Sequence, residues 1–266
     1  MKEKEREGNS VLIEALDLRE REVISLAGAG GKTTLMFRLA MELFLAGKKV
    51  VTTTTTKIFE PASGETRSLF IHADEEELRQ FVYKHLDEDR HVTIARERLG
   101  SGKLRGVSSN LVDDLSRSDR VDHLIVEADG AAGRPVKAPR EGEPVIPSST
   151  TLVVAVLGVD GVEKELNEEN VFQAERVSKM TGIPIGSKMT DEAMALLVTH
   201  PEGIFKGAPS SSRVIVFLNK ADIPGRIIRA KEIAQDIIRR KHPRIERVIW
   251  GQLRNEPPVA EVVWRG

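Results

Sequence analysis

A glycine-rich segment followed by a lysine and two threonines is the first part of this chain whose residue types and spacing predict chemistry. The segment reads SLAGAGGKTTLM over residues 25–36. Glycines allow backbone N–H groups to turn inward, and the N-terminus of a following helix adds further free N–H groups that attract an anion. We therefore expect a loop that binds the phosphates of a nucleotide, made of Gly28, Ala29, Gly30, Gly31, Lys32, Thr33 and Thr34.

The segment departs from the usual phosphate-loop pattern G-x-x-x-x-G-K-[ST], because Leu26 occupies the position of the first glycine. Its form GAGGKTT is similar to the G-x-x-GKTT loop of Mur ligases. It also resembles the loops of the deviant Walker ATPases, whose additional lysine would fall at Ala27. In this interpretation Lys32 reaches the terminal phosphates as a catalytic cation, and the Thr33 hydroxyl is a ligand of Mg²⁺. A glycine turn that binds nothing is the alternative.

Two acidic residues end the apolar segment HLIVEAD, residues 123–129. Side chains two positions apart in a strand point to the same face, so Glu127 and Asp129 are expected together. At the carboxyl edge of a parallel sheet, both carboxylates would lie near the metal and the terminal phosphate. We predict that both are catalytic, one holding a Mg²⁺-bound water and the other positioning the attacking water, and that Asp129 is a metal ligand. A pair of solvated acids at a strand end is the alternative.

The segment TTTTTKIFEP, residues 52–61, places five threonines and a lysine at the end of the next predicted strand. Threonine hydroxyls at such an edge bind Mg²⁺ or phosphate oxygens, and a lysine there neutralises developing negative charge. We predict that Thr55, Thr56 and Lys57 form the functional end, with Thr55 as a metal ligand and Lys57 as a catalytic cation. A β-branched strand without any ligand already explains the first three threonines.

The segment VIVFLNKAD, residues 214–222, ends an apolar strand in a pattern that resembles the NKxD motif of GTPases. In that motif the aspartate accepts hydrogen bonds from the N1 and 2-amino groups of guanine, and the lysine stem covers the base. Adenine offers no such donors, so the carboxylate discriminates between the two bases. We predict that Asn219, Lys220 and Asp222 read the base. A surface turn is the alternative.

The segment DGAAGRPVKAPREGEPVIP, residues 129–147, is predicted to be an unusually long loop, and loops of this length often carry a function. It follows the acidic strand, where the switch segments of P-loop proteins lie, so we expect a switch-like loop over residues 130–150. Arg134 and Lys137 are the candidates to sense the γ-phosphate or to bind an anionic substrate. An ordinary proline-rich surface loop is the alternative.

Strands that alternate with helices must position these residues. The apolar and β-branched segments predict strands over residues 22–27, 48–56, 69–73, 92–95, 123–129, 151–158, 213–219 and 247–250. Helical patterns fall between them, over residues 33–47, 74–86, 109–117, 168–180, 190–198 and 225–241. Residues 11–16 fit a strand or a helix.

This order predicts an α/β protein, a three-layer α/β/α sandwich with a mostly parallel sheet of the P-loop NTPase type. Residues 1–10, which are mostly charged, are expected to be a flexible tail. Residues 11–266 are expected to form a single nucleotide-binding domain.

The overall composition excludes several classes of function. The chain has 266 residues, a net charge of −1 and no cysteine, which excludes thiolate catalysis, disulfides and cysteine-ligated metals. We expect neither nucleic acid nor a membrane as a partner, and a cytoplasmic location, because there is no global positive field, no apolar span and no secretory signal. Five histidines lack metal-ligand spacing and are expected to be solvated or hydrogen-bonded: His72, His85, His91, His123 and His242.

Taken together, the segments resemble one known family, the YqeC family of selenium-dependent hydroxylase accessory or selenium cofactor biosynthesis proteins. They are GAGGKTT, VTTTTTKIF, VEADGAAGRPVKAP with EPVIP, HPEGIFKGAP and LNKAD, in this order over residues 22–250. The family usually has PLKAP where this chain has PVKAP. The resemblance implies a P-loop NTPase that helps to mature selenium-containing molybdenum hydroxylases. It implies as partners a molybdenum hydroxylase or a protein of the selenium or molybdenum cofactor pathway.

Three functional hypotheses follow. The first is a hydrolase of GTP, or of ATP, that uses Mg²⁺ and acts as an accessory factor in maturation of these hydroxylases. The second is an ATP-dependent ligase or kinase like the Mur ligases, in which the basic loop holds a small anionic acceptor. The third is a non-catalytic module whose loop at residues 130–147 changes order with nucleotide state.

Overall fold

The computed structural model describes residues 11–265, and the flexible tail predicted for residues 1–10 lies outside them. The strands of the main sheet are β1 (Glu22–Gly28), β2 (Val50–Thr54), β4 (Ser68–Ile71), β5 (His91–Ala95), β8 (His123–Glu127), β10 (Leu152–Gly158), β12 (Arg213–Asn219), β13 (Ile245–Gly251) and β14 (Val259–Trp264). The helices are α1 (Val11–Ala15), α2 (Lys32–Leu45), α3 (Glu75–Asp89), α4 (Ser109–Ser116), α5 (Ala174–Thr181), α6 (Asp191–Thr199) and α7 (Pro224–Arg239), with one 3₁₀ turn, η1 (Val159–Gly161).

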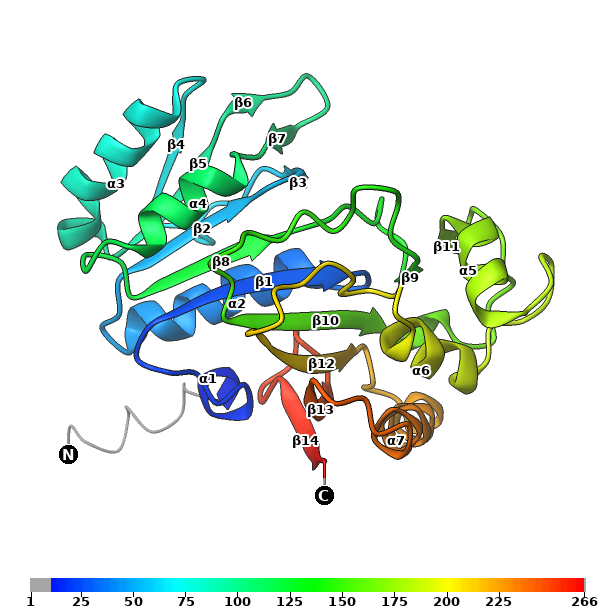
Figure 1. Cartoon of the computed structure of the whole chain (residues 1–266). Helices are drawn as coiled ribbons and strands as arrows, with labels where there is room; N and C mark the ends of the chain where they lie inside the picture. The colour runs from blue at the N-terminus through cyan, green and yellow to red at the C-terminus, as the bar shows by residue number, and fades with distance from the viewer. Residues whose placement is uncertain (1–10, 266) are drawn as a thin grey trace, which may run out of the picture.

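Within the described residues the main sheet has nine strands in the order β14-β13-β12-β10-β1-β8-β2-β5-β4. Neighbouring strands run parallel except β13 and β14, which pair antiparallel. Helices cover both faces of this sheet (Figure 1). The predicted α/β class and three-layer sandwich with a mostly parallel sheet are therefore confirmed. The prediction of a single domain over residues 11–266 stays a prediction.

The alternation of buried side chains along each strand assigns the helices to two layers. On β10, Val154 and Val156 belong to the apolar core around α1 and α2, whereas Val153 and Ala155 belong to the core around α5, α6 and α7. Helices α3 and α4 cover the part of the second face formed by β2, β5 and β8. Because both faces of the sheet are covered, its central strands β1, β2, β8 and β10 are buried along their whole length, as parallel strands usually are.

Several short elements carry too few residues for a periodic signal and are absent from the sequence prediction. Residues 11–16, left open between strand and helix, form the short helix α1. Strand β14 extends the sheet beyond its predicted edge. Two small sheets stand beside the main one, formed by β3 (Lys57–Phe59), β7 (Lys103–Arg105) and β6 (Glu97–Arg98), and by β9 (Val136–Lys137) and β11 (Val171–Phe172).

The chain reverses its direction across the sheet between β1 and β10. After β1 it crosses through α2 to β2 on one side, whereas after β10 it continues to β12 on the other side. Ligands of open α/β sheets bind outside the carboxyl ends of the strands at such a reversal. The loop after β1 is the glycine-rich segment, so the topology places the predicted phosphate loop at this point.

His91 is a buried histidine at the start of β5, in agreement with the expectation of a hydrogen-bonded side chain. Its Nε2 lies 3.1 Å from the Thr52 hydroxyl. Burial lowers the pKa of His91 from 6.5 to about 4. Between these two pH values the unfolded chain therefore binds a proton that the folded chain does not bind. The contribution of His91 to the free energy of unfolding is present above pH 6.5 and is lost as the pH falls toward 4.

We expect the His91→Asn variant to lose less stability than the parent as the pH is lowered from 6.5 to about 4. The parent should lose up to about 3 kcal/mol more of its free energy of unfolding over this range, by the linkage of pKa to stability. Urea unfolding at a series of pH values measures the difference. The exposed His72, changed to asparagine, is the control and should follow the parent. Equal slopes for His91→Asn and the parent would contradict the buried, uncharged histidine.

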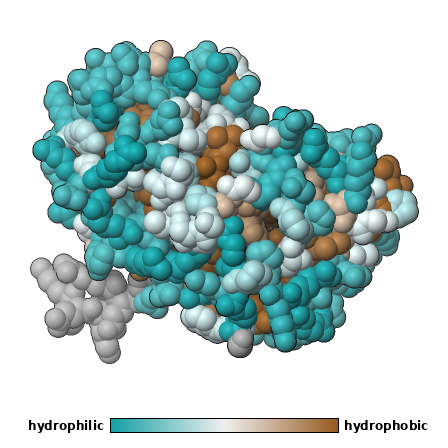
Figure 2. Space-filling model, viewed as in Figure 1, coloured by the Kyte–Doolittle hydropathy of each residue, from teal (hydrophilic) through white to brown (hydrophobic). Residues whose placement is uncertain are grey.

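The surface of the protein is rich in polar side chains, as expected of a chain in which 30% of the residues are charged. The face in Figure 2 is mostly hydrophilic, with apolar side chains gathered toward its middle. No helix in the described part of the chain is both long enough and apolar enough to cross a membrane.

Candidate functional site

The loop between β1 and α2 is a tight turn that only glycine accommodates at several positions. Gly28, Gly30 and Gly31 have φ values of 102°, 82° and 143°, a region that L-residues with side chains rarely adopt. A Cβ on Gly30 would lie 2.4 Å from the backbone nitrogen of Gly158, at the end of β10. The glycines therefore allow the loop to lie against the neighbouring strand.

Backbone N–H groups without an acceptor gather at this loop. Among residues 11–265, the N–H groups of Gly30 and Gly31 make no backbone hydrogen bond. No side chain caps the N-terminus of α2 at Gly31. The first N–H groups of a helix have no partner within it and carry its positive dipole end. The loop and the start of α2 thus have the free N–H groups that an anion site requires, and the binding of a nucleotide phosphate there stays a prediction.

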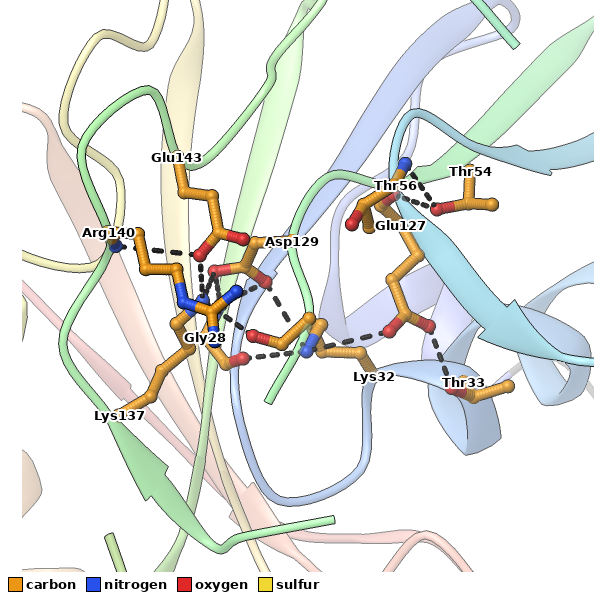
Figure 3. A network of polar contacts seen from close by, with 11 residues as sticks. Gly28, Lys32, Thr33, Thr54, Thr56, Glu127, Asp129, Lys137, Arg140 and Glu143 are labelled. Atoms are coloured by element: carbon orange, nitrogen blue, oxygen red, sulfur yellow. Dashed lines mark hydrogen bonds and ion pairs between the residues drawn. The ribbon is translucent and has the colours of Figure 1, made fainter. Parts of the chain in front are cut away.

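Lys32, the first residue of α2, is folded back into this cradle and is only 4% exposed. Its Nζ donates to the Gly28 carbonyl at 2.6 Å and lies 3.3 Å from Asp129 and 3.5 Å from Glu127 (Figure 3). Burial lowers the pKa of Lys32, but the two carboxylates outweigh burial, so the pKa lies above its ordinary value. The structure thus brings Lys32 together with both acids of the acidic strand.

Glu127 ends β8 on the face of the sheet that α2 covers. Strand periodicity places it on the same face as Ile125, which packs in the core around α2. One Glu127 oxygen accepts a hydrogen bond from the Thr33 hydroxyl at 2.7 Å. Burial raises the pKa of Glu127, although Lys32 and the Thr33 hydroxyl oppose this effect. Glu127 is therefore held between the first two residues of α2.

Asp129 is fully buried, and its carboxylate is engaged by neighbouring groups. Both of its oxygens lie 3.1 Å from the Gly28 N–H. One oxygen lies 3.3 Å from Lys32 and the other 2.8 Å from Lys137. Asp129 therefore lies between two lysines and fixes the start of the glycine loop, and its predicted role as a metal ligand stays a prediction.

The Thr33 hydroxyl and the Glu127 carboxylate are the oxygen ligands best placed for Mg²⁺. Mg²⁺ usually takes one or two protein oxygens and completes its shell with phosphate oxygens and water. Among residues 11–265, no three or more His, Cys, Asp or Glu side chains converge on one point. These residues therefore fit an ion that arrives with a phosphate group and do not form a closed metal site.

Lys137 and Arg134, the predicted substrate residues, lie in different environments. Lys137 is fully buried, and its Nζ contacts the Gly130 carbonyl at 2.7 Å and Glu143 at 3.0 Å in addition to Asp129. Lys137 therefore anchors the loop after β8 to the phosphate loop. Arg134 lines the cleft, but its guanidinium donates to backbone carbonyls of this loop and of Glu168.

The threonine run lies beside the acidic strand. The Thr54 hydroxyl donates to the Glu127 carbonyl at 2.7 Å and so joins the two strand ends. The hydroxyl of Thr55, predicted to bind the metal, donates to the Val145 carbonyl at 2.7 Å, and Thr55 does not line the cleft. Thr56 and Lys57 do line it. Of the residues predicted to be functional here, Thr56 and Lys57 thus lie in the cleft, and their roles stay predictions.

Asn219 lies directly against the phosphate loop. Its Nδ2 donates to the Gly30 carbonyl at 2.8 Å, and its Oδ1 accepts from the Leu253 N–H at 2.9 Å. Lys220 lies in the same cleft, and its Nζ contacts Asp160 at 2.8 Å. Asp222 is at the surface, with its carboxylate 3.8 Å from Arg226. The structure therefore places two of the three predicted base readers in the cleft and the third beside it.

These elements surround a cleft of about 620 Å³, within the usual size range of small-molecule sites. Sequence reasoning missed several of its residues, which come from short strands and from distant segments without a recognisable motif: Ile58, Phe59, Lys103, Glu143, Phe172, Arg226, Gln252 and Arg254. The short strands are too brief for a periodic pattern, so no signal in the sequence pointed toward these residues.

Two comparisons with known proteins bear on this geometry. A family model described as YqeC protein matches residues 24–175. The chain is also 31% identical over 258 residues to a protein named "Uncharacterized protein YqeC" from Escherichia coli (strain K12), with 94% of this chain and 95% of that protein covered. The chain belongs to the YqeC family. The YqeC family match includes the phosphate loop, the acidic strand and the loop with Lys137, whereas Asn219 and Asp222 lie outside it.

Proposed function

We propose that this YqeC-family chain is a Mg²⁺-dependent P-loop nucleotide hydrolase. The observation that carries the proposal is the convergence of Lys32, Glu127 and Asp129 at a glycine loop whose N–H groups have no backbone acceptor. A buried lysine held by two carboxylates is a charge arrangement typical of functional sites. A terminal phosphate is an anion that the cradle and this lysine would bind together.

Each residue has a defined task in this proposal. The N–H groups of the loop and of α2 bind the phosphates, and Lys32 turns from the Gly28 carbonyl to the γ-phosphate. Thr33 and Glu127 hold Mg²⁺, which neutralises charge on the phosphate oxygens when bound. Asp129 keeps the loop in place through Gly28, and Lys57 at the cleft wall offsets the charge that develops during transfer.

We further propose that the base is guanine, read by Asp222 beside Lys220. Asn219 supports this proposal because it joins the end of β12 to the phosphate loop, so that the base site and the phosphate site have a fixed spacing. Equilibrium binding of GTP, GDP, ATP and ADP with Mg²⁺, measured by calorimetry, tests both parts. Binding of none of the four would contradict the phosphate site, and a preference for ATP would contradict the guanine assignment.

The Asp222→Asn variant should bind GTP about 10- to 100-fold more weakly, because two hydrogen bonds to a charged acceptor are lost. Its affinity for ATP should change by less than about twofold, since adenine has no donors to offer this carboxylate. Calorimetry with both nucleotides measures the two affinities on the same preparation, so that ATP is the internal control. An equal loss for the two nucleotides would show that Asp222 does not read the base.

The biological role that we propose is that of an accessory factor in the maturation of selenium-dependent molybdenum hydroxylases. Its support is the family resemblance of the segments around the cleft. A strain that lacks this chain should produce such a hydroxylase with less activity and less bound selenium. Normal hydroxylase activity and selenium content in that strain would exclude the role without touching the nucleotide site.

A ligase or kinase is the second candidate function, and one specific observation favours it. The cleft is also lined by cations that do not belong to the glycine loop, including Lys57 and Arg140. An acceptor-dependent release of ADP, absent without the acceptor, would distinguish this function from hydrolysis.

A further inference from the structure

The cleft contains a second group of charged and aromatic residues, of which only Lys57 has a task in the proposed nucleotide chemistry. We call it the cationic arm and define it by Lys57, Phe59, Lys103, Arg140 and Phe172, which line the same cleft as the phosphate loop. The first three belong to strands β3 and β7 of a small sheet. Arg140 comes from the loop after β9, and Phe172 comes from β11.

The cations of this arm have no carboxylate to neutralise them. Within residues 11–265, neither Lys57, Lys103 nor Arg140 forms an ion pair. The carboxylates that line the same cleft are already engaged, Glu127 with Lys32 and Glu143 with Lys137. Unbalanced charge of one sign in a concave, low-dielectric space concentrates ligands of the opposite sign.

Aromatic rings hold two of these cations in place without neutralising them. The Lys103 Nζ lies 4.8 Å from the ring centroid of Phe59, its cross-strand partner between β3 and β7. The Arg140 guanidinium lies 4.4 Å from the ring centroid of Phe172. Such cation–π contacts restrict the side chain and leave the N–H groups free to bind an oxyanion. Phe59 is 62% exposed, so its contact with Lys103 lies at the surface of the protein and not in the core.

We propose that the cationic arm binds a second small molecule that carries at least two anionic groups, phosphate or carboxylate, beside the nucleotide. The inference rests on the proposed function, because it assumes that a nucleotide occupies the neighbouring phosphate loop. A multiply charged ligand fits because three separate cations face one space. The arm is treated as separate from the glycine loop because Lys103 and Arg140 form no hydrogen bond or ion pair with Gly28, Lys32 or Thr33.

The test is a calorimetric titration in the presence of saturating Mg²⁺ and the nucleotide that binds most tightly, so that the phosphate loop is filled. The probes are fructose 1,6-bisphosphate, citrate and, as the uncharged comparison, fructose. We expect one or both anions to bind and fructose not to bind. Lys103→Ala and Arg140→Ala should each weaken binding of the anion by about tenfold or more, because each loses a charge-assisted contact.

Matched controls separate the possible failures. Lys188→Ala removes an exposed lysine outside the cleft and should bind the anion like the parent, and both arm variants should bind nucleotide like the parent. If the protein binds nucleotide but neither anion, the inference is overturned and the proposed function still stands. The same holds if Lys103→Ala and Arg140→Ala both bind the anion as tightly as the parent. If no nucleotide binds, the proposed function fails, and titration of the nucleotide-free protein and its arm variants still tests the arm.

Discussion

Replacing Lys32 by alanine is expected to abolish binding of Mg²⁺-nucleotide and also to lower the free energy of unfolding by roughly 3–5 kcal/mol. The first effect follows from the loss of the cation that faces the terminal phosphates. The second follows from the structure, because Glu127 and Asp129 would remain buried near each other without the positive charge between them. Removing one partner of a buried ion pair leaves an uncompensated charge, which is far more costly than losing a surface pair.

Two measurements are therefore needed on this variant. Urea unfolding gives the free energy, and calorimetry at a temperature where the variant is still folded gives the affinity. Lys32→Arg keeps the positive charge and should recover part of the stability, while its larger planar group still impairs nucleotide binding. An alanine variant that is as stable as the parent and binds nucleotide as tightly would refute both the cradle and the buried cluster.

Replacing Lys137 by methionine is expected to lower the free energy of unfolding by about 3 kcal/mol, as the loss of a buried ion-pair partner does. Lys137 is fully buried and contacts Asp129, Glu143 and the Gly130 carbonyl. Methionine fills a similar volume but cannot neutralise either carboxylate. The loop over residues 130–143 should become more accessible, which hydrogen exchange or limited proteolysis would detect.

Lys57→Met is the control for this second variant. Lys57 is an exposed lysine that lines the same cleft, so its replacement should change the free energy of unfolding by no more than about 0.5 kcal/mol. Urea unfolding of the two variants side by side gives the comparison. Equal stability for Lys137→Met and Lys57→Met would show that Lys137 does not hold the loop.

Sequence patterns predicted the parts of the site that regular strand and helix geometry determines. Glu127 follows from strand periodicity, and Lys32 and Thr33 follow from their position at the start of a helix after a glycine turn. The roles of Glu127 and Asp129 cannot be separated in this way. They share a face by periodicity, and only the path of the loop beyond β8, which brings Lys137 to Asp129, distinguishes them.

The remaining site residues depend on contacts between distant segments. A lysine is almost never fully buried, so nothing local predicted that Lys137 would lie in the interior. Phe172 and Arg140 meet only because β9 pairs with β11. Strands of two or three residues have no recognisable period, and for this reason the small sheet that carries Phe59 and Lys103 was not foreseen.

The hydrogen bonds of Asn219 to Gly30 and to Leu253 have a consequence for how the protein is made. Asn219 and Leu253, which hold this loop from one side, are synthesised 189 or more residues after Gly30. A nascent chain that still lacks β12 and the residues after β13 carries the complete loop sequence without the neighbours that shape it. The growing polypeptide thus completes the contacts of this glycine loop only after Asn219 and Leu253 have been added, so the surroundings of an early motif depend on segments that are translated much later.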